Sequence, residues 1–463
     1  MEMISLGENC AIILAAGDGK RMKSTLPKVL NEVLFEPMLE WVLLACENSG
    51  LDKLCVVAGY KHEEVENYLG GRCDIALQLE RRGTAHAVMQ AEHFLNKSSK
   101  ICDNVLILCG DAPFMNEQTI TNALNLHTEC DNDVTVITAI LDDPTGYGRI
   151  VKDGDKISAI VEQKEASEGQ LLIKEVNSGA YWFKISTLLS ILDEFESDNS
   201  QNEFYLTDAI SIILNRGGSA GAFAADDSKI VLGANDKRAL YNLHKMANDE
   251  VINKHFDNGV EFLSLDGVLI GRNVKIGANV KIHAGTIIKG DSIIGEDSII
   301  GPNTIVDNCI VGNRSILNSV QAYDSTIYSD VKIGPFVHIR PNSEIRSGVK
   351  IGDFVEIKNS TIGEDTSIAH LTYVGDSDVG EKVNFGCGCV TVNYDGSKKS
   401  RTIIKDRAFI GCNTNLIAPV TIGEGAYTAA GSTITKDVPD HALGIERGKQ
   451  SNKEGYALKK LKK

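Results

Sequence analysis

The chain has 463 residues, about three times the size of a usual domain, so we expect two or three domains. Its 47 basic and 63 acidic residues give a formal net charge of −16, which argues against nucleic-acid binding because that needs a basic face. No run of 18 or more apolar residues occurs, so neither a transmembrane helix nor membrane insertion is expected. The polar start is unlike a secretory signal, and the eleven cysteines lack paired CxxC spacing, which indicates reduced thiols in a cytoplasmic protein.

Residues 9 to about 237 alternate apolar, strand-like runs with helical stretches. The strand-like runs occupy 11–17, 53–60 and 104–111, and helical patterns occupy 38–50 and 84–95. This alternation predicts a mostly parallel sheet with helices on both faces. Sites in such sheets lie beyond the carboxyl ends of the strands, where the glycine-rich turn at 17–19 and the pair Gly110–Asp111 are found.

Residues 238–256 carry apolar residues at helical spacing without glycine or proline, which predicts a connecting helix. From Ile270 the period changes to six. Aliphatic residues recur at Ile270, Ile276, Ile282, Ile288, Ile294, Ile300 and Val306, then at Ile333, Ile339, Ile345, Ile351 and Ile357, and again at Ile404, Ile410, Leu416 and Ile422. Such hexads are typical of a parallel β-helix, in which three hexads close one triangular coil around inward-pointing aliphatic residues. The register slips near 309–332, and the break at 390–403 predicts a projecting loop.

The most informative stretch of the first half is LAAGDGKRMKSTLPKVL at 14–30. Gly17 and Gly19 would let the backbone approach a triphosphate closely. Arg21 and Lys28 could neutralise charge that develops on the α-phosphate and the pyrophosphate. A GxG turn alone would more often be structural, but GxGxR followed by Pro-Lys at this spacing is far more specific.

This stretch resembles sugar-nucleotide pyrophosphorylases, especially the family of bifunctional UDP-N-acetylglucosamine pyrophosphorylases / glucosamine-1-phosphate N-acetyltransferases. Further matching stretches follow in order: QLERRGTAHA (78–87), CGDAPF (109–114), DDPTGYGRIV (142–151), IVEQKEAS (160–167), VNSGAYWF (176–183) and GAND (233–236). The resemblance covers nearly the whole chain. Together with the hexads it implies an α/β protein with an N-terminal Rossmann-like nucleotidyltransferase domain at 1–237, a linker helix at 238–258 and a C-terminal left-handed parallel β-helix at 259–463.

The resemblance implies roles for single residues of the first half. The residues that would bind UDP-N-acetylglucosamine are Leu14, Ala15, Ala16, Gly17, Lys28, Gln78, Gly83, Thr84, Gly148, Glu162, Asn177 and Asn235. Arg21 and Lys28 would be catalytic, and Asp111 and Asn235 would ligate Mg²⁺, a hard cation suited to a carboxylate and an amide completed by phosphates and water. Other interpretations remain: Asp111 could cap a helix, Glu162 could be a solvated acid, and Asn177 could be a turn residue.

In the second half, ionisable residues interrupt the repetitive wall. Arg340 and Lys358 are 18 residues apart, so they would stack on adjacent coils as a phosphate clamp, or would simply be two exposed basic residues. By resemblance, His370 is the general base for acetyl transfer, and Glu356 could orient it. The resemblance assigns glucosamine-1-phosphate to Arg340, Lys358, Tyr373 and Asn384, and acetyl-CoA to Cys387, Asn393, Tyr394, Cys412, Ala430 and Arg447, with Asn393 and Tyr394 also near the sugar phosphate.

The implied reactions are acetylation of glucosamine-1-phosphate by acetyl-CoA, then union of the product with UTP to give UDP-N-acetylglucosamine and pyrophosphate for cell-wall precursors. The family implies a homotrimer that holds coenzyme A between neighbouring prisms. Cys412 stands where relatives commonly carry serine, and its role is open because a thiol donates hydrogen bonds poorly. Two alternatives are a pyrophosphorylase whose β-helix is only an allosteric or oligomerising module, and a β-helix scaffold. The strings AHLTYVGD and VNYDG argue against the first, and the stretch 14–28 against the second.

Overall fold

The computed structural model describes residues 9–154, 156–197 and 202–461. The chain divides between Ala247 and Asn248 into two compact units, which are described separately. The division falls inside the long helix α9 (Lys237–Asp257), the segment expected to be a linker. Each unit therefore includes part of that helix.

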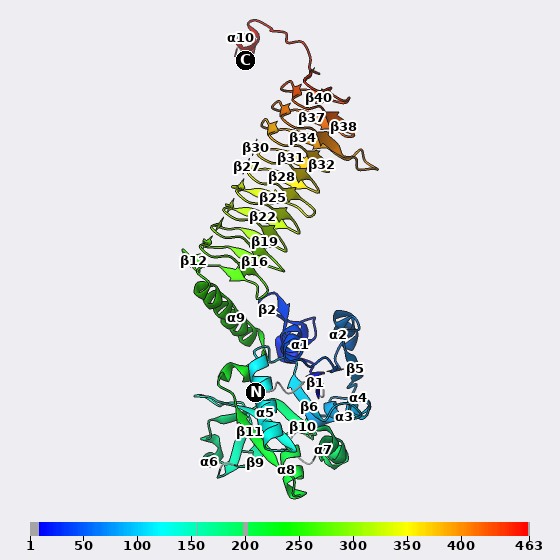
Figure 1. The fold of residues 1–463 in the computed structure, drawn as a ribbon, viewed down its shortest axis with the longest axis vertical. Helices are drawn as coiled ribbons and strands as arrows, with labels where there is room; N and C mark the ends of the chain where they lie inside the picture. Colours follow the sequence, from blue (N-terminus) through cyan, green and yellow to red (C-terminus); the bar gives the residue numbers. More distant parts are fainter. Residues whose placement is uncertain (1–8, 155, 198–201, 462–463) are drawn as a thin grey trace. The chain divides into compact units, whose positions relative to one another are not determined.

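The amino-terminal unit is built on a nine-stranded sheet (Figure 1). Its main path runs β11 (Ala220–Ala224), β7 (Val134–Ile140), β10 (Glu175–Lys184), β6 (Asn104–Cys109), β1 (Asn9–Ala15), β4 (Leu54–Ala58) and β5 (Asp74–Leu77). A hairpin of β8 (Arg149–Asp153) and β9 (Lys156–Val161) joins through β10, and β2 (Glu32–Val33) pairs with β3 (Glu36–Pro37) separately. The sheet is mixed rather than mostly parallel, because β10 runs antiparallel to both of its neighbours, β6 and β7.

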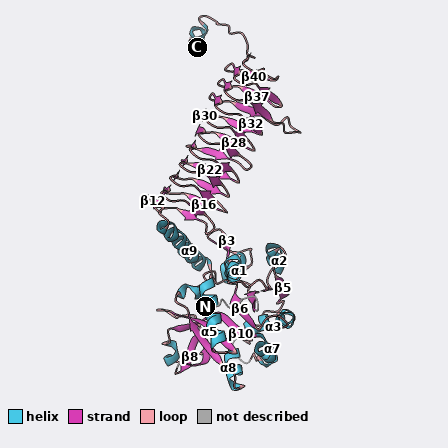
Figure 2. Ribbon diagram, viewed as in Figure 1, coloured by secondary structure: helices cyan, strands magenta, loops and turns pink. Residues whose placement is uncertain are grey.

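Helices cover both faces of this sheet (Figure 2). They are α1 (Met38–Asn48), α2 (His62–Leu69), α3 (Thr84–Gln90), α4 (Glu92–Ser98), α5 (Glu117–Glu129), α6 (Glu168–Leu171), α7 (Ile185–Ile191) and α8 (Asp208–Asn215), with short 3₁₀ turns at Lys20–Met22, Lys28–Leu30, Leu192–Glu194 and Ser228–Val231. Successive residues of β1 serve different cores: Ile12 packs into one, and Ala11 and Ile13 into the other. The single helix expected at 84–95 is two helices, because the backbone turns at Ala91.

The second unit is a parallel β-helix of short strands, here called the prism, whose three faces are three parallel sheets. One face holds β12 (Glu261–Phe262), β15 (Lys281–Ile282), β18 (Ile299–Ile300), β21 (Ile316–Leu317), β24 (Lys332–Ile333), β27 (Lys350–Asp353), β30 (Ser367–His370), β33 (Asn384–Phe385), β36 (Phe409–Ile410), β39 (Tyr427–Thr428) and β41 (Leu443–Gly444). The second holds β13 (Leu269–Ile270), β16 (Ile287–Lys289), β19 (Ile305–Asp307), β22 (Val320–Tyr323), β25 (Val337–Ile339), β28 (Glu356–Lys358), β31 (Tyr373–Gly375), β34 (Val390–Val392), β37 (Asn415–Ile417) and β40 (Thr433–Ile434). The third holds β14 (Lys275–Ile276), β17 (Ile293–Ile294), β20 (Ile310–Val311), β23 (Thr326–Ile327), β26 (Glu344–Ile345), β29 (Thr361–Ile362), β32 (Ser377–Val379), β35 (Thr402–Ile404) and β38 (Val420–Ile422). A last short helix, α10 (Tyr456–Lys460), follows the prism.

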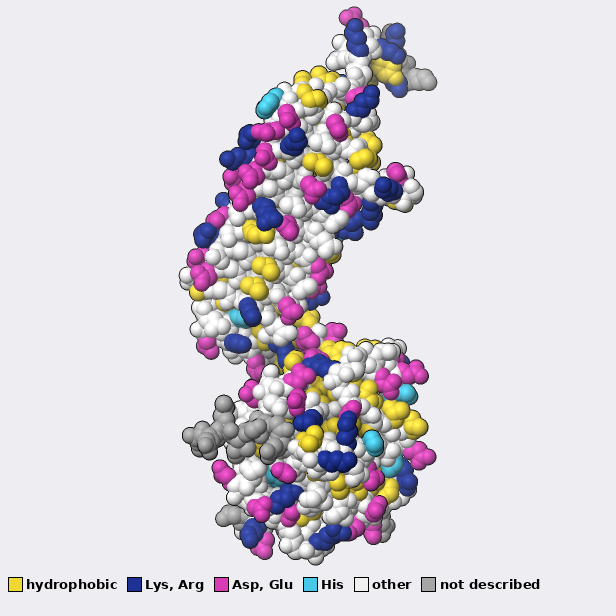
Figure 3. Space-filling view, turned by 45° about the vertical axis from the view of Figure 1, so that its right-hand side comes forward, with side chains coloured by type: hydrophobic (Ala, Val, Ile, Leu, Met, Phe, Trp, Pro, Cys, Tyr) yellow, Lys and Arg dark blue, Asp and Glu magenta, His cyan; other side chains and the backbone are white. Residues whose placement is uncertain are grey.

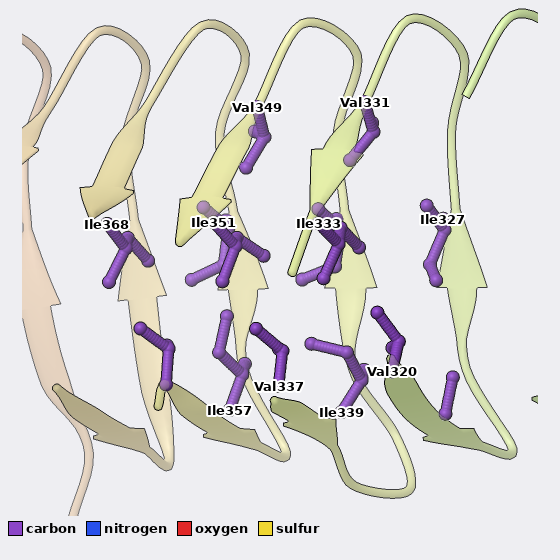
Figure 4. Packing of buried hydrophobic residues seen from close by; sticks show 14 of the residues in the cluster. Val320, Ile327, Val331, Ile333, Val337, Ile339, Val349, Ile351, Ile357 and Ile368 are labelled. Atoms are coloured by element: carbon purple, nitrogen blue, oxygen red, sulfur yellow. The ribbon is translucent and has the colours of Figure 1, made fainter. Parts of the chain in front are cut away.

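The aliphatic residues at six-residue spacing form one continuous core inside the prism, and each of them is buried. Figure 4 shows part of this core. Ile288 stacks on Val306, eighteen residues on, as three hexads per coil require. Val306 stacks on Ala322, only sixteen residues on, so coils in the region of the register slip have shorter corners. The sequence pattern is lost there although the architecture continues.

The break in the hexads is a loop that projects from the prism near β32 and β34 (Figure 1). The predicted projecting loop is present, but the predicted range of 390–403 is too long, because β34 and β35 continue the wall of the prism at either end. The exposed part is closed by an antiparallel bridge between Tyr394 and Lys399. Within the described residues, no helix has the length and apolar character needed to cross a lipid bilayer.

Candidate active sites

A cavity of about 760 Å³ lies in the amino-terminal unit, at the carboxyl ends of β1 and β6. Of the residues predicted to bind UDP-N-acetylglucosamine or metal, those that line it are Leu14, Ala15, Ala16, Gly17, Lys28, Gln78, Gly83, Thr84, Asp111, Glu162 and Asn177. They come from at least five separate segments of the chain. This is the position at which parallel strands of an α/β sheet usually present a binding site.

The glycine-rich turn shapes the wall of this cavity. Gly17 has open space where a Cβ would stand, so the backbone there is accessible to a ligand. Gly19 adopts a φ of +55°, and a Cβ on it would meet the Lys28 Cβ at 2.9 Å, which excludes most other residues. The turn therefore both exposes its backbone and packs against the segment that carries Lys28.

Lys28 joins the two residues predicted to hold a metal. Its ammonium donates to Asn235 Oδ1 at 2.7 Å and forms an ion pair with Asp111. A carboxylate and an amide oxygen thus converge on a single cationic group, which shows that they are close enough to share one cation. Two oxygen ligands of this kind suit Mg²⁺, which usually completes its shell with substrate phosphates and water. The residues present therefore fit the metal.

Two further residues that line the cavity, Asn177 and Glu162, present hydrogen-bonding groups. Asn177 donates to the Tyr181 hydroxyl at 2.7 Å and accepts from the Gly179 amide at 2.9 Å, so its side chain is fixed. Burial raises the pKa of Glu162, and the charges of Glu165 and Asp208 add to this. A fixed amide and a half-buried carboxyl can both bind hydroxyl groups, as a sugar requires.

Gln78 is almost fully buried and donates to the Gly83 carbonyl at 3.0 Å. Gly83 has a φ of +105° and touches the backbone of Phe204, so no side chain fits there. The Thr84 hydroxyl accepts from the Leu206 amide at 3.0 Å. The loop from 78 to 84 is thus held to the segment that begins near 203, and this second segment, whose Glu203, Tyr205 and Thr207 line the cavity, was missed by the sequence analysis.

Three predicted residues do not line the cavity. Asn235 lies next to Lys28, and Gly148 lies next to Glu162, since a Cβ on Gly148 would lie 3.4 Å from Glu162 Oε1. Arg21 is exposed and is not part of the wall, whereas its neighbour Lys20 is. Of the two predicted catalytic cations, Lys28 therefore lines the cavity and Arg21 does not.

In the prism, four residues predicted for acetyl transfer form one column along a corner. Ile368 pairs with Phe385 and Tyr373 with Val390, so His370 stands one coil before Cys387. The next pairs, Phe385 with Ile410 and Val390 with Asn415, place Cys412 beside Cys387. The following coil places Ala430 beside Cys412, where the Gly431 amide donates to the Cys412 carbonyl at 2.7 Å.

The column continues to the predicted coenzyme-A residue Arg447, whose guanidinium donates to the Ala430 carbonyl at 3.1 Å. These residues are far apart in the sequence, and the stacking of coils alone brings them into line. His370 has an exposed side chain, with Asp353 at 3.9 Å on the preceding coil. Glu356, expected to orient His370, instead accepts from Arg340 at 2.9 Å.

A second group lies on the neighbouring face. Arg340 and Lys358 are in register on adjacent coils, as their spacing of 18 predicts. The Lys399 side chain, from the projecting loop, lies against Lys358 and lowers its pKa, and Arg340 adds to this effect. Positive side chains gather around the projecting loop in Figure 3. Three cations held close together without enough carboxylates to neutralise them are suited to a phosphate. Lys399 was not predicted, because the loop does not follow the hexad register.

Asp376 ties the projecting loop to this face. It is buried, accepts from Asn359 at 2.5 Å, and is also hydrogen-bonded by Asn393. Burial alone would raise its pKa, but these hydrogen bonds and the charges of Lys358 and Lys399 outweigh burial and lower it. Asn393 also lies 3.5 Å from the Tyr373 hydroxyl, so the predicted residues Lys358, Tyr373 and Asn393 do come together.

Two other predicted residues stand apart from this group. Asn384 begins β33 on the eleven-stranded face, in register with Ser367, while Arg340 and Lys358 belong to the ten-stranded face. Tyr394 is exposed, and its hydroxyl donates to the Gly396 carbonyl at 2.6 Å within the loop. One copy of the chain therefore presents its predicted acetyl-transfer residues on two faces that diverge around a corner.

Comparison with known proteins identifies the family of the chain. Residues 10–241 match the nucleotidyl transferase family, and residues 273–308 and 401–436 match the bacterial transferase hexapeptide family. The chain is 46% identical over 451 residues to the bifunctional protein GlmU of Acetivibrio thermocellus, covering 97% of each chain. It is 48% identical to that of Caldanaerobacter subterraneus subsp. tengcongensis (98% of this chain, 99% of the relative) and 44% identical to that of Bacillus subtilis (96% and 97%). The chain therefore belongs to the bifunctional GlmU family, and it is an enzyme with a uridylyltransferase half and a glucosamine-1-phosphate acetyltransferase half that act in UDP-N-acetylglucosamine synthesis.

Proposed function

We propose that the two reactions take place at the two sites described above and run in sequence. The prism transfers the acetyl group of acetyl-CoA to the amine of glucosamine-1-phosphate. The cavity of the amino-terminal unit then joins the product to UTP, which gives UDP-N-acetylglucosamine and pyrophosphate. The observation that carries this division is that the family's predicted residues gather into two separate sets, one at the cavity and one along the prism corner.

In the cavity, the sugar phosphate oxygen attacks the α-phosphorus of UTP and pyrophosphate leaves, so negative charge builds up on phosphate oxygens. Lys28 stabilises that charge, because its ammonium lies at the cavity, beside Asp111 and Asn235. The same two residues would hold Mg²⁺, which when bound neutralises phosphate charge. Glu162 and Asn177 would bind the sugar, and Gln78 with the loop before α3 would bind the base.

At the prism corner, the amine of glucosamine-1-phosphate attacks the thioester carbon and loses a proton, the C–S bond breaks, and coenzyme A leaves as its free thiol. His370 takes that proton as general base. Arg340, Lys358 and Lys399 hold the phosphate, and Tyr373 and Asn393 lie against the sugar. The column from Cys387 through Cys412 to Ala430 and Arg447 forms the track for coenzyme A, with Arg447 facing its phosphates.

We propose that the active form is a homotrimer. Asn384 and Arg340 lie on different outward faces of one prism, so a small molecule can contact both sets of residues only if neighbouring copies face each other. The cytoplasm is the proposed location, because the proposed substrates UTP and acetyl-CoA are cytoplasmic metabolites. Sedimentation at assay concentration should show a trimer, and an active monomer would contradict this part of the proposal.

A paired assay tests the proposed division of labour. Incubation with acetyl-CoA and glucosamine-1-phosphate should release free thiol, and incubation of N-acetylglucosamine-1-phosphate with UTP and Mg²⁺ should release pyrophosphate. Thiol release that does not depend on glucosamine-1-phosphate would contradict the acetyl acceptor, and equal turnover of CTP would contradict the choice of base.

A further inference from the structure

An acidic residue lies within the turn that is proposed to face the triphosphate. Asp18 stands between Gly17 and Gly19, and it lines the cavity. Its side chain is only 27% exposed. A carboxylate in this position repels a polyphosphate, because charges of the same sign interact strongly at a partly desolvated site. Something must therefore offset its charge if UTP is to bind there.

The structure supplies a partner from another segment. Arg81, in the loop before α3, lines the same cavity, and its Nη1 lies 2.6 Å from Asp18 Oδ2. Lys20 is a second partner at 3.3 Å, but its side chain is 85% exposed and so is well screened by solvent. Burial alone would raise the pKa of Asp18, but the hydrogen bond from Lys20 and the charge of Arg81 lower it, so the carboxylate is ionised at neutral pH.

We propose that Arg81 is a positioning residue for UTP, which acts by neutralising the charge of Asp18. With the pair formed, the turn presents its backbone to the triphosphate without a net negative charge. Without Arg81, the ionised Asp18 faces the phosphates. This inference rests on the proposed binding of UTP in this cavity and adds to it a residue that governs affinity through another side chain.

A double-mutant cycle tests the inference through KM for UTP. Arg81→Gln should raise KM for UTP about tenfold and leave kcat little changed, because the loss is in ground-state binding. Asp18→Asn alone should leave KM for UTP unchanged or slightly lower. KM for UTP in the double variant should lie within about twofold of that in Asp18→Asn, because once the carboxylate is gone there is no charge for Arg81 to neutralise.

Arg82→Gln is the matched control, since it removes the same charge one residue further along. The Arg82 guanidinium lies over the Phe204 ring at 5.0 Å rather than on Asp18. The effect of Arg82→Gln on KM for UTP should therefore be the same whether residue 18 is aspartate or asparagine. A double variant whose KM for UTP is as high as that of Arg81→Gln would overturn the inference, since Arg81 would then act directly on UTP or on the shape of the loop. Absence of uridylyl transfer in the unmodified enzyme would instead overturn the proposed function.

Discussion

His370 ends β30 with 59% of its side chain exposed, on the corner where the acetyl-transfer column begins. The attacking amine must lose a proton, and an imidazole is the side chain best matched to accept one near neutral pH. We therefore predict that His370→Ala lowers the acetyl-transfer rate by about 10²–10⁴-fold, with the affinity for coenzyme A and uridylyl transfer near normal. Thiol release measured from pH 6 to 9 checks this. A variant that kept most of its rate across that range would show that the base is elsewhere.

Cys412 offers a comparison on the same column. It is exposed and stands beside Cys387, in a position from which a donor could reach the thioester carbonyl in the proposed complex. A hydroxyl is a better hydrogen-bond donor than a thiol. Cys412→Ser should therefore preserve or raise kcat for acetyl transfer, measured with saturating acetyl-CoA. A clear fall in kcat with unchanged folding would mean that the thiol itself is required.

Gly375 is in register with Lys358, and a Cβ added to it would overlap the Tyr373 hydroxyl. The Tyr373 side chain would have to move away from Asn393 and from the cluster of cations. We predict that Gly375→Ala raises KM for glucosamine-1-phosphate about tenfold or more and changes KM for acetyl-CoA much less. Gly169→Ala, in helix α6 of the amino-terminal unit, is a control for acetyl-transfer assays, because a Cβ there meets no neighbouring atom.

At the scale of elements, the aliphatic hexads predicted the prism and its core because side chains inside a narrow coil must repeat with the coil. The stretch 309–332 could not be placed in advance, since coils shortened to sixteen or seventeen residues keep the fold while they lose the period. The reversed direction of β10 was also not predictable, because a strand buried on both faces has the same composition in either direction.

The candidate site residues could likewise be predicted only where a sequence pattern or the family resemblance specifies their position. Residues that share a strand end or a coil register, such as Asp111 or the pair Arg340 and Lys358, followed from the pattern or from the family resemblance. Lys399 and Arg81 did not, because each is brought to its site by a loop whose path no periodicity specifies. The position of Arg21 outside the cavity wall also depends on the path of the turn rather than on its composition.

A buried histidine joins three elements of the amino-terminal unit. His127 of α5 is 1% exposed and lies 3.0 Å from the Thr135 hydroxyl of β7 and 3.3 Å from Asn104 Oδ1 of β6. Burial lowers its pKa to about 4, and Lys184 contributes. The unfolded chain, with an ordinary histidine pKa near 6.5, binds the proton first as pH falls. The contribution of His127 to the free energy of unfolding is therefore retained above pH 6.5 and is lost as pH falls towards 4.

We predict that this residue alone removes about 2 kcal/mol of stability from the amino-terminal unit between pH 7.5 and pH 5. Both tryptophans, Trp41 and Trp182, lie in that unit, so tryptophan fluorescence during denaturant unfolding reports on it selectively. His127→Gln should reduce the difference between the two pH values, although it lowers stability at pH 7.5. His93→Gln, at an exposed position, is the control. An unchanged pH dependence in His127→Gln would show that other groups govern acid unfolding.

At the scale of the whole molecule, the two proposed sites lie in two separately packed units. Among the described residues, the hydrophobic core of the prism contains none from the sheet that carries the cavity, and the two cores of that sheet contain none from the prism. A change confined to one site should therefore leave the other site's chemistry intact. Asp111 is the best residue for this test, because it is predicted to ligate the metal and is already seen to pair with Lys28.

We predict that Asp111→Ala abolishes uridylyl transfer, since it removes a metal ligand and frees Lys28 from its position, and that acetyl transfer keeps its rate. A chelator that removes divalent cations should have the same selective effect on the unmodified enzyme, because His370 and the cations of the prism need no metal. Pyrophosphate release and thiol release, measured on the same preparation, compare the two activities. Asp143→Ala is the matched control, because it also removes one carboxylate, from an exposed loop of the same unit. Equal loss of both activities in a folded Asp111→Ala protein would show that the sites are coupled, and the two-site account would then be wrong.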